Sequence, residues 1–270
     1  MSALHLRRSI RAIEARWLEA HPPLTLMRRA AETLADTCAE VARQGKPRLP
    51  IYAMVGPGNN GGDAMLAALM LRGKGFDARA VPLDSHGIPT GDAGEVWRLC
   101  RAEALPVMTG LPAQLGCGDA LFIDGLFGIG LSRPIDGLAR EWILQLNAAQ
   151  ARVVAADVPS GIDADTGGVV GGLTGVALRA RSTVSFLADK PGLHTGAGLE
   201  HAGEVRVSDL GCTATLGDAT LIDRDELTPI AARLRRKPDS HKGSFGQVCV
   251  IGGGRGMEGA ALLAALGAQR

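Results

Sequence analysis

Three stretches of this chain are apolar over the length of a strand, and small polar residues follow each one at once. They are IYAMV at 51–55, DALFID at 119–124 and RVVAAD at 152–157. Strands that are apolar on both faces are typical of a parallel sheet covered by helices. In such open sheets, ligands bind beyond the carboxyl ends of the strands. The loops that follow, at 56–63, 125–131 and 158–163, are therefore predicted to form one site.

The rest of the first 212 residues alternates helical and extended patterns. In 24–43, Leu26, Ala30, Leu34 and Cys38 recur at spacings that make one apolar helix face. Helices are expected at 9–20, 24–43, 62–72, 91–103 and 137–149, and further strands at 77–83, 105–108, 183–188 and 204–208. Short connections between alternating strands and helices predict an α/β fold, a Rossmann-like three-layer α/β/α sandwich with a mostly parallel sheet.

The composition changes near Cys212. We expect one domain at 1–212, a linker at 213–240 with a short helix near 225–235, and a second segment at 241–270. That segment has an apolar run at 246–251, a glycine-rich turn and an Ala/Leu helix, which is the pattern of one strand and one helix. Because one such pair cannot bury its own apolar face, we interpret 241–270 as the truncated start of another α/β domain.

Composition excludes several classes of function. The formal net charge is +1 with acids and bases intermixed, so bulk electrostatics favours neither nucleic acid nor a membrane surface as partner. No segment approaches the ~20 apolar residues that cross a bilayer, and the charged start lacks a signal-peptide pattern. The odd, scattered set of 5 cysteines predicts neither a disulfide framework nor a zinc site. A cytoplasmic location is expected.

The loop at Gly56–Gly61 matches G-x-G-x-x-G between a strand and a helix, the context in which that motif binds dinucleotides. One interpretation is therefore a dehydrogenase, with Asp84 holding a ribose at the end of the second strand. Another is a tight turn without a ligand. The paired amides of Asn59 and Asn60, followed by Asp63, weaken both interpretations, and a second match at Gly254–Gly259 shows how little the motif proves alone.

Four longer motifs are more specific. GPGNNGGDAMLAA, DGLFGIGLSRPIDG, AADVPSGIDADTG and FLADKPGLHTGAG occur in the order found in NAD(P)H-hydrate epimerases, the YjeF N-terminal domain family, which residues 8–212 resemble. Ala64 and Ile129 depart from the usual Gly and Thr without removing a charged group. The tail from His241 looks like the opening of the ribokinase-like, ADP-dependent NAD(P)H-hydrate dehydratase domain, which bacteria often fuse to the epimerase. Dehydratase activity, with ADP or ATP, is expected only in a full-length protein.

The resemblance implies an isomerase that interconverts the (R)- and (S)-forms of NADH or NADPH hydrated at C6 of the nicotinamide. It assigns substrate binding to two loops, to the catalytic aspartate and to a lysine: Asn59, Asn60, Gly61, Gly62, Asp63, Gly128, Ile129, Gly130, Leu131, Ser132, Arg133, Pro134, Asp157 and Lys190. It also implies a K+ ion on Asn60, Asp124 and Ser160. Amide, carboxylate and hydroxyl oxygens are ligands that hard cations prefer.

Asp157 is the expected catalytic residue. Inversion of the C6 hemiaminal, by ring opening or by loss and return of water, requires a proton transfer near the hydroxyl, and a carboxylate at a strand end can provide it. Structural alternatives stay open for each residue. Asp157 and Asp124 could cap turns, Ser160 could be an ordinary turn residue, and Arg133 and Lys190 could be solvated.

Two other kinds of function remain. The same domain occurs as a non-catalytic module in an mRNA-decapping scaffold, and a dehydrogenase would need a catalytic His or Tyr-Lys pair that is not recognisable here. We expect a small-molecule substrate (NADHX or NADPHX) and a homo-oligomer, with neither nucleic acid nor membrane as partner.

Overall fold

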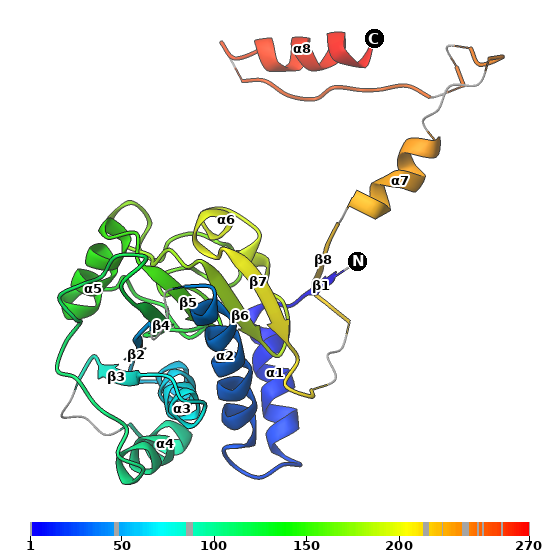
Figure 1. The fold of residues 1–270 in the computed structure, drawn as a ribbon. Coiled ribbons are helices and arrows are strands. Elements are labelled where there is room, and N and C mark those ends of the chain that lie inside the picture. Colours follow the sequence, from blue (N-terminus) through cyan, green and yellow to red (C-terminus); the bar gives the residue numbers. More distant parts are fainter. Residues whose placement is uncertain are drawn as a thin grey trace. The chain divides into compact units, whose positions relative to one another are not determined.

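The computed structural model describes residues 2–45, 49–84, 89–212, 216–222, 224–233, 238–241, 243–244, 246–254 and 256–269. The chain divides into two compact units, Met1–Leu221 and Ile222–Arg270. The first contains the sheet and every residue of the predicted site (Figure 1).

Six parallel strands form the main sheet of the first unit. They are β2 (Ile51–Val55), β3 (Ala78–Pro82), β4 (Leu121–Gly125), β5 (Arg152–Ala156), β6 (Ser182–Phe186) and β7 (Glu204–Ser208). Their order is β3-β2-β4-β5-β6-β7, and every neighbouring pair is parallel. The chain moves outward from β2 to β3 and then returns to the other side of β2. Such a reversal opens a crevice between β2 and β4, which is where open α/β sheets bind ligands.

Helices cover both faces of this sheet, which confirms the predicted α/β class (Figure 1). The larger helices are α1 (Arg7–Leu18), α2 (Thr25–Arg43), α3 (Asn59–Gly73), α4 (Gly91–Ala102) and α5 (Gly137–Ala148), and shorter ones are η1 (Gly172–Thr174), η2 (Pro191–Leu193) and α6 (Gly198–His201). Helix α3 begins three residues earlier than expected, because the extended Gly58 lets the first turn start at Asn59. The polar side chains of 59–63 therefore lie on a helix end rather than in a loop.

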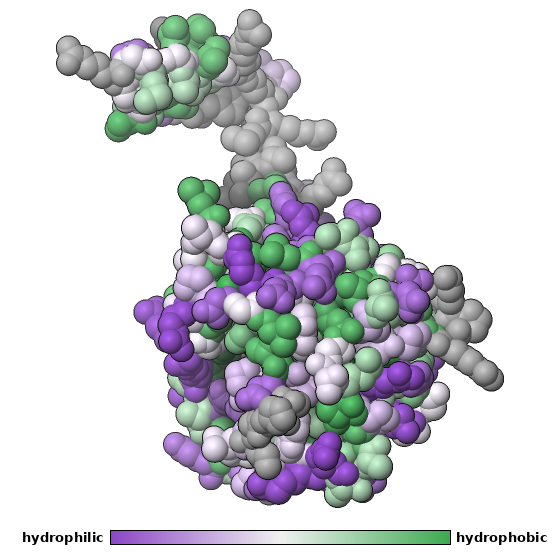
Figure 2. All heavy atoms as spheres, turned by 90° about the vertical axis from the view of Figure 1, so that its left-hand side faces the viewer, coloured by the Kyte–Doolittle hydropathy of each residue, from purple (hydrophilic) through white to green (hydrophobic). Residues whose placement is uncertain are grey.

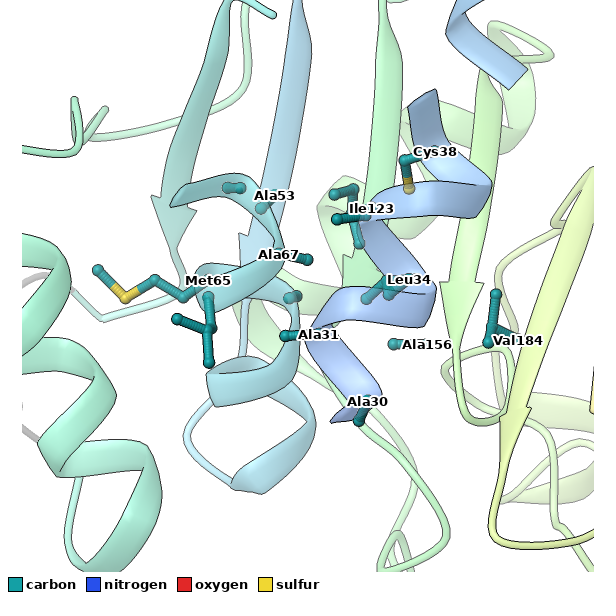
Figure 3. Close-up of a cluster of buried hydrophobic side chains, with 14 of the residues drawn as sticks. Ala30, Ala31, Leu34, Cys38, Ala53, Met65, Ala67, Ile123, Ala156 and Val184 are labelled. Carbon is teal, nitrogen blue, oxygen red and sulfur yellow. The ribbon is translucent and has the colours of Figure 1, made fainter. Parts of the chain in front are cut away.

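Alternating strand residues separate the core into two layers. Ile51 and Ala53 pack with helices α1 to α4, whereas Tyr52 and Met54 pack with Trp142 and the rest of α5. Figure 3 shows the first layer, in which Ala31 and Leu34 of α2 lie over Ile123 and Ala156 of the sheet. Aromatic residues make up only 3% of the chain, and alanines take their place at this interface. Because alanine side chains are small, α2 and α3 can approach the strands closely.

Three sequence-based predictions differ from the structure. Residues 105–108 form a single bridge, Val107 to Ala80, rather than a strand. Residues 219–221, placed in the linker, form β8 (Ala219–Leu221), which pairs antiparallel with β1 (Ser2–Leu4). Residues 246–251 are irregular, because a strand needs a partner and the described part of the second unit contains none. That unit does contain the helices α7 (Arg224–Arg233) and α8 (Gly259–Ala268), close to the two helices expected there.

The surface of the first unit is mixed in character. Figure 2 shows hydrophobic and hydrophilic residues interspersed over one face, and α5 exposes two leucines, Leu138 and Leu144. Among the described residues, none of the helices is both long and apolar enough to cross a membrane.

Candidate functional site

A cleft of about 550 Å³ lies at the carboxyl ends of the strands. Its walls come from the loops after β2, β4, β5, β6 and β7, from the starts of α2, α3 and α4, and from one face of α1. The strand ends, the loops that follow them and the first turns of α3 contribute Pro57, Gly58, Asn59, Asn60, Asp63, Leu126, Phe127, Gly128, Ile129, Gly130, Leu131, Ser132, Arg133, Asp157, Phe186 and Leu187. The helices and the last loop add Ile10, Arg11, Glu14, Leu18, Leu26, Met27, Ala30, Asp92 and Leu210. Two of the three loops singled out in the sequence, 56–63 and 125–131, therefore line one cleft. The third loop, 158–163, contributes none of the lining residues, and only Asp157 just before it reaches the cleft.

Asn60 is one of the residues that line this cleft. It lies in the first turn of α3, and both polar atoms of its side chain, Oδ1 and Nδ2, are buried without a hydrogen-bond partner. A Cβ built on Gly128 would lie 3.3 Å from the Asn60 Cγ, so a larger residue there would push this side chain by a few tenths of an ångström. An unpaired buried amide costs about 1–3 kcal/mol, which indicates that a ligand group is meant to meet it.

Asp124 and Ser160 form a buried hydrogen-bonded cluster, and neither residue lines the cleft. The Ser160 hydroxyl donates to Asp124 Oδ1 at 2.6 Å, and the Ser160 N–H donates to Oδ2 at 2.8 Å. The Leu126 N–H adds a third hydrogen bond to Oδ1, and the Phe127 N–H donates to the Ser160 hydroxyl. These bonds tie the loop after β4 to the loop after β5. Complete burial nevertheless raises the pKa of Asp124 to about 6, with the hydrogen bonds acting in the opposite direction.

Asp157 reaches the cleft from the end of β5 with an unusual backbone. Its φ is +68°, a left-handed conformation that residues other than glycine seldom adopt and that is concentrated at functional sites. Its N–H donates to the Val184 carbonyl at 2.8 Å, which holds this turn against β6. Carboxylate oxygen Oδ2 would lie 3.4 Å from a Cβ on Gly128, so Asp157 and Asn60 approach the same glycine.

Further carboxylates line the cleft around Asp157. Burial is the main cause that raises the pKa of Asp63 well above its ordinary value, and the negative charges of Asp157, Glu14 and Asp92 add to it. Burial and the charge of Asp157 raise the pKa of Glu14 in the same way. Burial and neighbouring negative charge thus favour the protonated form of Asp63 and Glu14 relative to ordinary carboxyls.

Sequence reasoning did not single out Arg11, Glu14 and Asp92. The helix at 9–20 was expected, and Ile10, Glu14 and Leu18 lie at intervals of four on one of its faces. That periodicity was the available signal. It could not say that this face covers the site, because α1 packs there through contacts with residues far along the chain, such as Arg7 with Asp163 at 2.6 Å.

Several predicted substrate-binding residues do not line the cleft. Gly61 packs so closely on the loop before it that a Cβ would lie 2.1 Å from the Gly56 carbonyl, and Gly62 is crowded by Met27. Pro134 lies just past the lining loop. Asp84, the residue that a dehydrogenase would need, is exposed and also lies outside the cleft lining.

The solvated alternative for Lys190 is wrong. Its side chain is 0% exposed and its ammonium lies 2.8 Å from Asp157 Oδ1. The same ammonium donates to the Ser185 hydroxyl and to the carbonyls of Phe186 and Ala188. Lys190 therefore lies behind the catalytic candidate and not on the cleft wall. By contrast, Asn59, Asn60, Asp63, residues 128–133 and Asp157 line the cleft as the sequence led us to expect.

The parallel sheet, the helix end at Asn59 and the cleft at the β2–β4 crevice define a Rossmann-like α/β protein with a small-molecule site. The chain belongs to the family described as YjeF-related protein N-terminus, which matches residues 23–192.

Curated relatives are of two kinds. One is the NAD(P)H-hydrate epimerase of Bordetella pertussis (strain CS), 37% identical over 225 residues, covering 83% of this chain and 95% of the relative. A second epimerase, from Limosilactobacillus fermentum, is 38% identical over 70% of this chain and 86% of its own length. The other kind is the bifunctional NAD(P)H-hydrate repair enzyme Nnr of Coxiella burnetii, 34% identical over 100% of this chain. The chain spans only 54% of that bifunctional protein's length.

A solved structure agrees on the fold. The crystal structure of yeast ynu0 superposes with a TM-score of 0.64 and covers 89% of this chain and 97% of its own, at 18% identity. At that identity the likeness concerns the fold alone.

Proposed function

We propose that residues 1–221 catalyse epimerisation of hydrated NADH and NADPH at C6 of the nicotinamide ring, a metabolite-repair reaction. The observation that carries this proposal is the convergence of Asn60 and Asp157 on Gly128 inside one cleft. Family membership and the printed names of the epimerase relatives support it.

The reacting carbon bears both the ring nitrogen and a hydroxyl. Its configuration inverts if the C6–N bond opens to an aldehyde and recloses, or if the hydroxyl leaves as water and returns on the other face. Ring opening removes the hydroxyl proton and adds a proton to nitrogen; loss of water adds a proton to the leaving oxygen. Either route therefore needs a group that both accepts and donates a proton beside C6.

We assign that role to Asp157. Its side chain is 13% exposed, so it is partly desolvated but reaches the cleft. General acid–base help of this kind contributes on the order of 10²–10⁴-fold to a rate. The acidic residues Asp63 and Glu14 lie in the same cleft and would surround the nicotinamide end.

The other end of the dinucleotide carries the diphosphate. We assign it to the loop 128–133, where main-chain N–H groups and the Arg133 guanidinium can meet phosphate oxygens. Arg11 of α1 faces the same loop, since a Cβ on Gly130 would lie 4.0 Å from its Nη2 atom.

The chain's residues also fit a potassium ion. Asn60 offers a buried amide oxygen without a partner, and Asp124 and Ser160 lie at neighbouring strand ends. We propose that these three residues hold the ion, with main-chain carbonyls completing its shell. When bound, potassium would neutralise the buried Asp124 carboxylate and give the Asn60 amide its missing contact.

The test is a direct assay. Purified protein is mixed with each epimer separately and the epimer ratio is followed by chromatography, with potassium or with sodium. We expect interconversion well above the buffer rate and a rate at least about 10²-fold lower in the Asp157→Asn variant. Interconversion no faster than in buffer would contradict the proposed function.

Two further points stay proposals. Residues 241–270 are proposed to begin a ribokinase-like dehydratase domain, because the bifunctional Coxiella relative aligns along the whole chain. The scaffold alternative predicts no turnover, so measurable epimerisation would exclude a purely non-catalytic module.

A further inference from the structure

The side chain of Lys190 is completely buried beside the cleft. It is 0% exposed, and buried charges persist in proteins only where other groups pair with them. Its partners therefore indicate its purpose.

The Lys190 ammonium is saturated by the protein. It lies 2.8 Å from Asp157 Oδ1, 2.8 Å from the Ser185 hydroxyl, 2.9 Å from the Phe186 carbonyl and 3.1 Å from the Ala188 carbonyl. An ammonium has three N–H donors, and the Ser185 hydroxyl and the Phe186 and Ala188 carbonyls take all three, so none is left for a substrate phosphate.

The two oxygens of Asp157 have different surroundings. Oδ1 is held by the Lys190 ammonium and by the Phe186 N–H, which donates at 3.3 Å. Oδ2 is the oxygen that approaches Gly128, a residue of the cleft wall, at 3.4 Å from a Cβ built there. Because the contacts of Oδ1 restrict rotation of the Asp157 carboxylate, they keep Oδ2 directed toward the cleft.

We infer that Lys190 is a positioning residue: its ammonium locks Asp157 Oδ1, so that Oδ2 is the oxygen that exchanges the proton with the substrate. This role rests on the proposed function of Asp157. Lys190 itself neither gives nor takes a proton and does not touch the substrate. A misplacement of a catalytic group by about 1 Å can lower a rate on the order of 10²-fold, which sets the effect expected when the lock is removed.

The main test compares Lys190→Met with the wild-type full chain, with initial rates measured over a range of substrate concentration. Methionine keeps the apolar stem and removes the charge. We expect kcat to fall about 10²-fold with KM changed less than about threefold, because orientation acts on the transition state. A variant with unchanged kcat, or with raised KM alone, would overturn the inference and favour a substrate-binding lysine.

Ser185→Ala is the matched control. It removes one acceptor of the Lys190 ammonium but leaves the ion pair with Asp157. If Lys190 merely steadies the turn after β6, both variants should lose kcat in parallel with their unfolding midpoints. If Lys190 positions Asp157, Ser185→Ala keeps kcat near the wild-type value.

A double-variant cycle keeps the inference testable if Lys190→Met folds poorly. Asp157→Asn leaves an ammonium buried without its counter-charge, so its unfolding midpoint should drop, and Asp157→Asn/Lys190→Met should recover part of that drop. Strictly additive midpoints would overturn the coupling. A wild-type protein without epimerase activity would contradict the proposed function instead, and the midpoint cycle would still decide whether the two side chains are coupled.

Discussion

The side chains of Asn60 and Asp157 both approach Gly128. A Cβ there would lie 3.3 Å from Asn60 Cγ, which is tighter than most side-chain contacts, and 3.4 Å from Asp157 Oδ2. Gly128→Ala should therefore crowd the reacting space while sparing the fold. We expect the epimerisation rate to fall about 10²-fold with little change in the unfolding midpoint, measured by the chromatographic assay and by thermal melting. Wild-type turnover in this variant would show that the substrate does not enter between Asn60 and Asp157. Gly73→Ala, where a Cβ has open space, is the matched control and should keep full activity.

The second residue-scale prediction concerns Asp124. Its pKa is raised from 3.8 to about 6, so the folded state binds its proton more tightly than the unfolded state does. The protonated form thus contributes stability that is present below pH 4 and is lost as the pH rises through about 6. The free energy of unfolding of the wild type should decrease by about 2–3 kcal/mol relative to Asp124→Asn between pH 4 and pH 7 in potassium-free buffer.

Urea denaturation at a series of pH values checks this expectation. Potassium added at pH 7 should restore much of the stability that the wild type loses relative to Asp124→Asn, because a bound cation offsets the cost of burying the ionised carboxylate. Parallel stability curves for the wild type and Asp124→Asn would contradict the assignment of this buried carboxylate.

At the scale of elements, helix α1 forms one wall of the cleft, and the contacts of its first turn fix its position. Its first N–H groups are held by distant acidic residues: Leu6 N–H donates to Asp218 at 3.0 Å and Arg7 N–H donates to Asp165 at 2.6 Å. The same helix brings Arg11 and Glu14 to the cleft. Asp218→Ala should loosen the start of α1 and raise KM about threefold to tenfold with a smaller effect on kcat.

Steady-state kinetics checks the expected effect on α1. Glu200→Ala is the control, since Glu200 is an exposed acid whose ion pair with Arg179 lies on other elements. Equal KM values for both variants would show that the end of α1 does not influence substrate binding.

At the scale of the whole molecule, the strand β8 sets where the first unit ends. β8 pairs with β1 and extends the unit to Leu221, beyond the predicted boundary at 212. A chain of residues 1–221 should keep the epimerase rate and the unfolding midpoint of the full protein. A chain of residues 1–212 lacks β8 and Asp218, and its midpoint should fall by about 2–4 °C for each kcal/mol lost. Thermal melting and the epimer assay decide between the two boundaries, and equal midpoints for both truncations would place the end of the unit at 212.

The sequence by itself determined the sheet and the loops that carry the site. Strands 51–55 and 204–208 agree with β2 and β7 at both ends, and the other sheet strands agree within about two residues, because an apolar run bounded by polar turns leaves few places for a buried strand. Asn60, Asp124 and Asp157 were identifiable because each stands at or just beyond the end of such a strand. Parallel strands align those ends at one edge whatever else the chain does.

Only the tertiary structure determined which residues from distant parts of the chain join the site. Glu14 and Asp92 join the cleft because α1 and α4 dock beside it. Lys190 turns inward because three hydrogen-bond acceptors and the Asp157 carboxylate gather around its ammonium. Pairing of β1 with β8 links residues more than two hundred positions apart. Periodicity reports which residues along an element share a face, whereas the partner of that face depends on contacts between distant parts of the chain. For that reason the sequence could mark Asp157 as the catalytic candidate, but only the folded chain could show which of its two oxygens faces the cleft.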